Sequence, residues 1–287
     1  MKDNKILLTF ISAFAVMLVF ALIVIIPRVN NDNDVSSDSI SMSEYFEPII
    51  YDDVIGEPQY DNMPEGVFYR SVTTRTVLSE SGSRLVLKYP TFEGFKGLNF
   101  NSEINALVLN YTKKMHRQNA DGFYSLVDLG AKVVYEIEDF EVVYGSDYLI
   151  SIVFRGFYES HIESSYTDSK KNAVCYSLNI ELKNKEIITS KDLISDFYAL
   201  KDSFLRGKME LSYSDKELFL GVSYSYMIDQ YKPEYKIFPD MYITDKGIYI
   251  IFLIPFELGG KAIYFDKFED TRSYINMDLL SNLKLVE

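Results

Sequence analysis

The first hydrophobic pattern in the chain is an unbroken apolar run at residues 6–26, ILLTFISAFAVMLVFALIVII, which contains no charged residue. A helix rises about 1.5 Å per residue, so this run spans roughly 30 Å, the thickness of the hydrocarbon core of a bilayer. A signal peptide has a shorter apolar region, of about 7–15 residues, and a small-residue cleavage site after it. No A-x-A pattern comes after this run. We therefore expect an uncleaved transmembrane helix from Ile6 to Ile26 rather than a cleaved signal.

The flanks of this run predict its orientation and the character of the next segment. Lys2 and Lys5 precede the run, and basic residues are retained on the cytoplasmic side of a membrane. We expect residues 1–5 to be a cytoplasmic stub. Residues 27–64 are expected to form a flexible extracytoplasmic linker, because the first part is rich in Asn, Asp and Ser. Its second part, Tyr45–Pro64, either packs as an extended arm or stays mobile.

Residues 65–287 show the patterns of a folded domain, beginning with a hairpin. Strands are predicted near Val67–Leu78 and Ser83–Tyr89, separated by a Ser-Glu-Ser-Gly turn, with Pro90 ending the second strand. A helix is then predicted after the candidate cap Asn101-Ser102, because apolar residues recur there every three or four positions. We expect this helix to lie against a sheet.

Later segments alternate between β-type and helical patterns. Residues 132–181 contain several β-branched and aromatic alternating runs, which predict an antiparallel meander. Thr189 or Ser190 can cap a helix that continues to about Leu205, and Ser214-x-x-Glu217 has the form of a capping box. Further strands are expected at 241–244, at 248–254 and, as an edge strand, at 262–265. The fold class predicted is α+β, with antiparallel sheets and packed helices after one N-terminal transmembrane helix.

Charge narrows the choice of partners. Residues 29–287 contain 26 of the 29 basic residues and 41 of the 42 acidic ones, a formal charge of −15. Such a surface repels nucleic acid and anionic lipid headgroups and attracts cationic partners, although it also serves solubility. Cys175 is the single cysteine, so no intramolecular disulfide is available. It lies in a strand-like run, and we expect it to be a buried thiol.

A search for catalytic and metal-binding patterns returns little. The chain has two histidines and lacks the H-E-x-x-H, G-x-S-x-G and phosphate-loop patterns, so we predict neither an enzyme nor a cofactor. His116 is expected to be solvated on its helix. Glu159, His161, Glu163 and Asp168 crowd one segment and could in principle bind a divalent cation, but acidic loops are common in so acidic a chain. No metal site is predicted.

Tyrosine is the more informative residue type, since the chain has 23 tyrosines and no tryptophan. Tyrosine offers amphipathic contact surface at low entropic cost, although strands also use it in cores. Tyr231 and Tyr235 are candidates for a recognition surface. The residues predicted to bind a ligand are Tyr158, His161, Glu163, Tyr166, Tyr224 and Tyr226.

Three stretches in order along the chain resemble one family. They are Leu87–Gly94 (LKYPTFEG) with the helix 101–109, then Tyr166-Thr167 with 176–187 (YSLNIELKNKEI) and Lys191-Asp192-Leu193, and finally 238–256 with the run YITDKGI. This arrangement resembles the extracytoplasmic domain pair of RsiV-like anti-sigma factors and PdaC-type peptidoglycan deacetylases. The resemblance implies an α+β domain in a Gram-positive-type cell envelope and, in some relatives, recognition of a protein such as lysozyme.

The sequence departs from that family in ways that affect function. Asp168–Asn172 replaces the glycine-histidine segment that follows Tyr-Thr in the family, and we expect neither an anti-sigma module ahead of Ile6 nor a deacetylase domain after the resembling stretches. We therefore expect a membrane-anchored extracytoplasmic domain that binds or senses a protein or cell-wall glycan, with a cationic protein such as lysozyme as one partner. The alternatives are an envelope glycan-acting enzyme that uses carboxylates such as Glu159 and Glu163, or an accessory subunit of a membrane complex.

Overall fold

The computed structural model describes residues 49–77, 82–119, 126–127, 131–161, 170–214 and 222–286. The predicted stub and transmembrane helix, Ile6 to Ile26, lie outside these residues. Within the described ranges, no helix combines the length and apolar character needed to cross a membrane.

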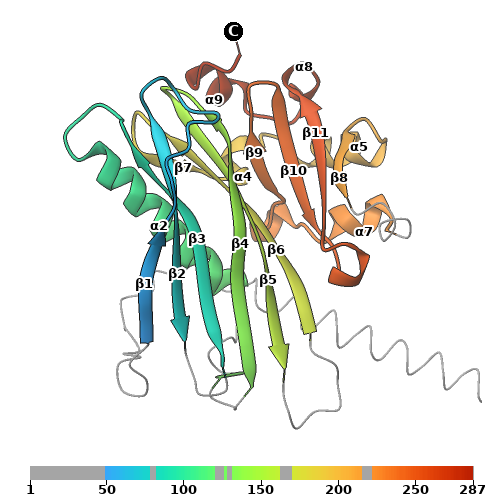
Figure 1. Ribbon diagram of the computed structural model, residues 1–287. Coiled ribbons are helices and arrows are strands. Elements are labelled where there is room, and N and C mark those ends of the chain that lie inside the picture. Colours follow the sequence, from blue (N-terminus) through green and yellow to red (C-terminus); the bar gives the residue numbers. More distant parts are fainter. Residues whose placement is uncertain are drawn as a thin grey trace, which may run out of the picture. The chain divides into compact units, whose positions relative to one another are not determined.

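The larger of two sheets has seven strands in the order β1-β2-β3-β4-β5-β6-β7 (Figure 1). Their bounds are β1 Ile49–Ile55, β2 Phe68–Val77, β3 Arg84–Glu93, β4 Lys132–Gly145, β5 Leu149–His161, β6 Lys170–Glu181 and β7 Glu186–Ile188. The predicted meander over 132–181 is confirmed as β4–β6. However, β3 and β4 are parallel, so the sheet is mixed rather than antiparallel. The reason is the intervening helix α2, Phe100–Asn119, which carries the chain back across the sheet.

Part of the range expected as a linker is a packed arm. β1 pairs with β2, and Gln59 exchanges backbone hydrogen bonds with Tyr69 at 2.8 and 2.9 Å. Residues 49–64 therefore take the extended-arm alternative, since their backbone groups gain partners along the free side of β2. Only the part of the linker before residue 49 lies outside the described residues.

Pro90 does not end its strand, contrary to the sequence prediction. It lies opposite Ser71, whose carbonyl accepts a hydrogen bond from Gly56 N at 2.7 Å on the side away from β3. Pro90 therefore faces away from β2 as well, and β4 pairs with β3 only at Arg84–Val86. The N–H that proline lacks would have no strand partner there, so the strand continues to Glu93.

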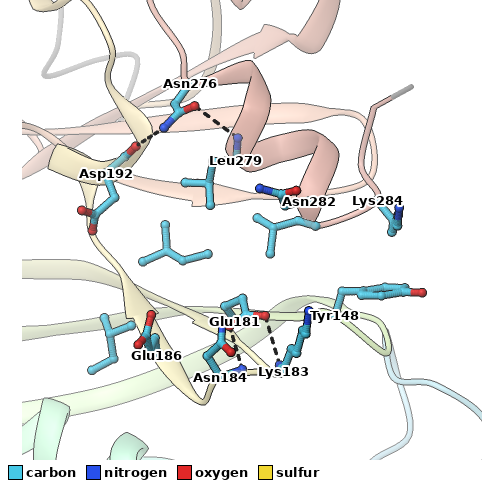
Figure 2. A pocket seen from close by; sticks show the side chains of 13 residues that line it. Tyr148, Glu181, Lys183, Asn184, Glu186, Asp192, Asn276, Leu279, Asn282 and Lys284 are labelled. Carbon is cyan, nitrogen blue, oxygen red and sulfur yellow. Dashed lines mark hydrogen bonds between the residues drawn. The ribbon is translucent and has the colours of Figure 1, made fainter.

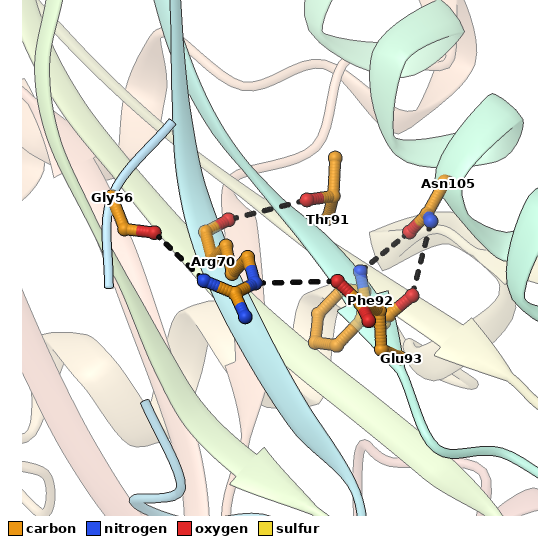
Figure 3. A network of polar contacts seen from close by, with 6 residues as sticks. All are labelled: Gly56, Arg70, Thr91, Phe92, Glu93 and Asn105. Atoms are coloured by element: carbon orange, nitrogen blue, oxygen red, sulfur yellow. Dashed lines mark hydrogen bonds and ion pairs between the residues drawn. The ribbon is translucent and has the colours of Figure 1, made fainter. Parts of the chain in front are cut away.

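Helix α2 covers one face of the large sheet and begins at Phe100, one residue before the predicted cap. Asn101 instead accepts a hydrogen bond from Phe95 N at 3.1 Å. Asn105 fastens the helix to the end of β3, because its side chain accepts from Phe92 N at 2.6 Å and donates to Phe92 O at 3.1 Å (Figure 3). On the far side of the strand, Arg70 lies between Glu93 and the carbonyl of Gly56.

His116 is buried on α2, so the prediction of a solvated side chain is wrong. Its side chain is 3% exposed, and its ring meets the edge of Tyr135 with centroids 4.6 Å apart. Ile104, Val108 and Thr112 are buried too and precede it at intervals of four residues, which places all four on one stripe of the helix. Burial, together with the nearby Arg117 charge, lowers the pKa of His116 to about 4.

The second sheet has four antiparallel strands in the order β8-β11-β10-β9. Their bounds are β8 Glu210–Ser214, β9 Asp240–Ile243, β10 Gly247–Leu253 and β11 Lys261–Lys267. The predicted pair 241–244 and 248–254 is confirmed as β9 and β10. The predicted edge strand at 262–265 is not at an edge, because β8 pairs with the other side of β11.

Short helices surround this second sheet. They are α4 Ser190–Leu193, α5 Phe197–Leu205, α7 Tyr224–Asp229, α8 Phe268–Thr271 and α9 Met277–Asn282, with 3-10 turns at Pro233–Tyr235 and Phe256–Leu258. The single helix predicted up to Leu205 is thus two helices. Thr189 caps the first and Asp196 caps the second. Between them Ile194 is extended and forms a bridge with Ile275, which ends the first helix.

The capping box suggested by Ser214-x-x-Glu217 lies mostly outside the described residues and stays a prediction. Ser214 ends strand β8, and Glu217 lies outside the described residues. The cap of α7 is Ser223, whose hydroxyl accepts from Tyr226 N at 3.2 Å.

Buried polar side chains join the two sheets at β9. Asn179 donates to Met241 O at 2.7 Å, and Ser177 donates to the same carbonyl at 2.6 Å. Ser151 accepts from Ile243 N at 3.1 Å and donates to Asn179 Oδ1 at 2.6 Å. Side chains of β5 and β6 therefore satisfy the open backbone edge of β9 where no strand pairs with it. Cys175 packs in an adjacent apolar cluster between the sheets, as a buried thiol, which confirms the prediction.

Candidate functional site

A cleft of about 730 Å³ opens beside the β6–β7 turn and helix α9 (Figure 2). It is lined by residues from four parts of the chain: Tyr148, Glu181, Lys183, Asn184, Glu186, Ile187, Ile188, Asp192, Asn276, Leu279, Asn282, Leu283 and Lys284. Apolar side chains of β7 and α9 belong to the buried cores below, so the floor of the cleft is fixed by packing. The polar side chains stand above that floor.

One wall of the cleft is the turn between β6 and β7. The carboxylate of Glu181 accepts hydrogen bonds from Lys183 N at 3.2 Å and from Asn184 N at 2.8 Å. Lys185 adopts φ 59° and forms an ion pair with Glu103 of α2. The turn is therefore held from inside by Glu181 and from outside by the helix, while the side chains of Lys183 and Asn184 stay exposed.

The opposite wall is α9, which Asn276 attaches to the segment after β7. Asn276 accepts from Leu279 N at 3.2 Å and donates to Asp192 O at 3.3 Å (Figure 2). Its own N–H donates to Leu193 O at 2.8 Å. One side chain thus caps α9 and ties it to α4, so this wall is preformed as the turn is.

Several polar and charged side chains that line the cleft have no ion-pair partner among the described residues. Lys183, Lys284 and Glu186 take part in no ion pair within the described ranges. Asn282 is exposed at the end of α9, where its amide can both donate and accept. A preformed cleft with a few convergent polar groups over an apolar floor is typical of a binding site.

The residues predicted to bind a ligand fall on two elements. Tyr158 and His161 lie at the end of β5 in the large sheet, where Tyr158 packs against the core beside α2 and His161 is exposed. Burial raises the pKa of Tyr158. Glu163 and Tyr166 lie outside the described residues.

Tyr224 and Tyr226 lie on α7, which packs on the small sheet (Figure 1). They are 44% and 54% exposed, and Tyr235 is exposed nearby in the sequence, whereas Tyr231 is buried in the core. Of the predicted residues that the structure describes, Tyr158, His161, Tyr224 and Tyr226, none lines the cleft. The described part of the chain also holds no group of three or more His, Cys, Asp or Glu side chains arranged to hold a metal ion.

Sequence reasoning missed the cleft because its walls are distant in the chain. The β6–β7 turn and α9 are separated by roughly ninety residues, and the pairing of Ile194 with Ile275 that brings them together leaves no local pattern. The Asn184-Lys185 pair is typical of a turn, but a turn by itself does not indicate a site.

Comparisons with known proteins describe similarity of shape. No family model matches the chain, and no curated protein matches it. Two of the solved structures that are similar to it are DUF3298 family proteins. A DUF3298 family member from Bacteroides fragilis has a TM-score of 0.43 and 13% identity over 76% of this chain and 97% of its own. A DUF3298 family protein from Pseudomonas aeruginosa has a TM-score of 0.44 and 9% identity over 75% and 95%. The resemblance to RsiV-like and PdaC-type proteins stays a prediction.

The residues that carry that resemblance are mostly scaffold. Tyr89, Phe92 and Ile243 are buried, and Asn179 belongs to the network between the sheets. Among the described residues of these motifs, only the stretch from Glu181 to Asp192 reaches the cleft. Most of the described motif residues therefore serve folding rather than ligand contact.

Proposed function

We propose that this protein is a non-catalytic ligand-binding protein that presents the described domain outside the cell on an N-terminal membrane anchor. The observation that carries the proposal is the preformed cleft between the β6–β7 turn and α9. Its side chains offer amides, ammonium groups and carboxylates without the ion pairs that occupy such groups elsewhere in the domain. A ligand supplies the missing partners.

The anchor in this proposal is the apolar run from Ile6 to Ile26. The negative charge of residues 29–287 disfavours contact with anionic headgroups, which leaves the domain available to ligands outside the membrane.

Exposure to external protease tests the anchor. In intact wall-stripped cells, added protease is expected to digest residues 49–286 and to leave a membrane-bound fragment that contains residues 6–26. A cytoplasmic marker protein in the same cells should remain uncut. Recovery of the undigested chain in the soluble fraction, or full protection of its domain in intact cells, would exclude the proposed topology.

The charge of −15 over residues 29–287 makes a cationic envelope-active protein such as lysozyme the first partner to test, and a cell-wall glycan the second. Attraction between the negative surface and a cationic partner raises the association rate, and salt weakens this attraction. The cleft then supplies the contacts that hold the bound partner.

A cleft-filling substitution tests whether that binding uses the cleft. The full chain in lipid nanodiscs is titrated with lysozyme and with soluble peptidoglycan fragments. Asn282→Trp places a large ring at the exposed end of α9 and is expected to weaken binding of the active probe by at least about tenfold. Asn110→Trp, on the exposed face of α2, is the matched control and should bind like the unchanged protein.

Two outcomes would contradict the proposal. Equal affinity in both tryptophan variants would place the ligand elsewhere on the domain. Turnover of the peptidoglycan fragments that disappears in Glu163→Gln would favour the rival function, an envelope enzyme that uses carboxylates near the end of β5.

A further inference from the structure

Charged side chains divide the cleft into a basic end and an acidic end (Figure 2). Lys183 and Lys284 lie toward the end marked by Tyr148, and Glu186 and Asp192 lie toward the opposite end. The separation follows from the fold. The basic pair comes from the β6–β7 turn and the end of the α9 segment, and the acidic pair comes from β7 and α4.

Three of the four charged side chains at the two ends, those of Lys183, Lys284 and Glu186, have no partner among the described residues. Neither lysine of the basic end takes part in an ion pair among the described residues, and neither does Glu186. The neighbouring residues Glu181 and Lys185 differ, because the first binds turn N–H groups and the second pairs with Glu103. At the acidic end, Asp192 accepts from Thr189 at 2.6 and 2.8 Å, so Glu186 is its freer carboxylate.

We propose that the ligand of this cleft is a short peptide with both termini charged. Its carboxylate binds Lys183 and Lys284, and its amino group binds Glu186. This inference rests on the proposed function and names the ligand class for the same site. A peptide with both termini charged gives both ends of the cleft a partner at once, whereas a cationic protein uses the acidic end and a neutral glycan uses the amides alone.

The middle of the cleft suits a peptide backbone. The exposed amides of Asn184 and Asn282 each carry a donor and an acceptor, as a peptide unit does. Below them, Ile187 and Leu279 are partly buried and offer apolar contact for small side chains. The overall negative charge of the domain does not oppose such a ligand, because a zwitterion has no net charge.

Alanine peptides of three to five residues test the inference with the full chain in nanodiscs. The free peptides are compared with forms that are amidated at the C-terminus or acetylated at the N-terminus. We expect at least one free peptide to bind, and each blocking group to weaken its affinity about fivefold. Amidation should have no further effect in the variant Lys183→Gln/Lys284→Gln, and acetylation none in Glu186→Gln.

Matched controls keep the charge change and move it away from the cleft. The full effect of each blocking group should remain in Lys114→Gln/Lys246→Gln, at exposed positions of α2 and of the β9–β10 turn, and in Glu257→Gln, in an exposed 3-10 turn. Equal affinity for free and doubly blocked peptides would overturn the inference.

The inference can fail while the proposed function stands. That result is no detectable peptide binding by a protein whose binding of lysozyme or peptidoglycan fragments is still weakened by Asn282→Trp. If Asn282→Trp weakens none of the probes, the proposed function fails as well.

Discussion

Replacing Asn179 with alanine is expected to lower the free energy of unfolding by about 2–3 kcal/mol. The side chain is 2% exposed, and its two hydrogen bonds join Ser151 on β5 to Met241 on β9. Without it, the hydroxyl of Ser151 loses its acceptor, the carbonyl of Met241 keeps only Ser177, and a small void remains. Chemical denaturation of the full chain in mild detergent, followed by near-ultraviolet circular dichroism, measures the loss.

Two further variants separate the network from general effects of the substitution. Asn110→Ala, on the exposed face of α2, should change stability by less than about 0.5 kcal/mol. Ser151→Ala and Asn179→Ala should cost less together than the sum of their single losses, because they share a bond. Additive losses, or a loss at Asn179 no larger than that at Asn110, would show that the side chains do not hold the sheets together.

Lowering the pH from 6.5 to 4 is expected to remove about 3 kcal/mol of stability through His116 alone. The folded pKa is about 4, whereas the unfolded value is about 6.5, so the unfolded chain binds the proton more tightly. The stabilisation is complete above the unfolded pKa and declines as the pH falls toward the folded pKa. Denaturation curves across this range measure the decline.

Substitution of each histidine in turn isolates the effect. His116→Gln should reduce the difference in stability between pH 6.5 and 4, because glutamine does not titrate. His161→Gln, at the exposed end of β5, should retain the full decline. Carboxylates contribute to the slope in every variant, so the comparison rests on the difference between them. The same decline in His116→Gln as in the unchanged protein would show that the imidazole is not buried in its neutral form.

Local patterns predicted the elements that depend on local spacing. Alternation over 132–181 is a property of each strand by itself, and so are the apolar runs that predicted strands at 241–244 and 248–254. The spacing of apolar residues along a helix also places His116 on the buried face of α2. Counting back in fours from His116 reaches Thr112, Val108 and Ile104, but a charged neighbourhood that includes Lys113 and Arg117 favoured the exposed interpretation.

Features that depend on distant pairing were not predictable in this way. The parallel register of β3 with β4 and the central position of β11 each require a partner strand that the local sequence does not specify. The cleft also depends on distant pairing, because Asn276 bonds to Asp192, and the strands of the second sheet lie between these two residues in the chain. The tyrosines on α7 could be proposed as binding residues from the sequence, whereas the charged cleft could be recognised only from the structure.

The central claim is that ligand binds between the β6–β7 turn and α9, and backbone hydrogen exchange tests it most directly. Exchange is measured for the full chain in nanodiscs, with and without whichever probe binds in the titrations. We predict that slowed exchange on binding concentrates in residues 182–188 and 276–284. Slowed exchange confined to α7 and the end of β5, with no change in those two segments, would contradict the claim.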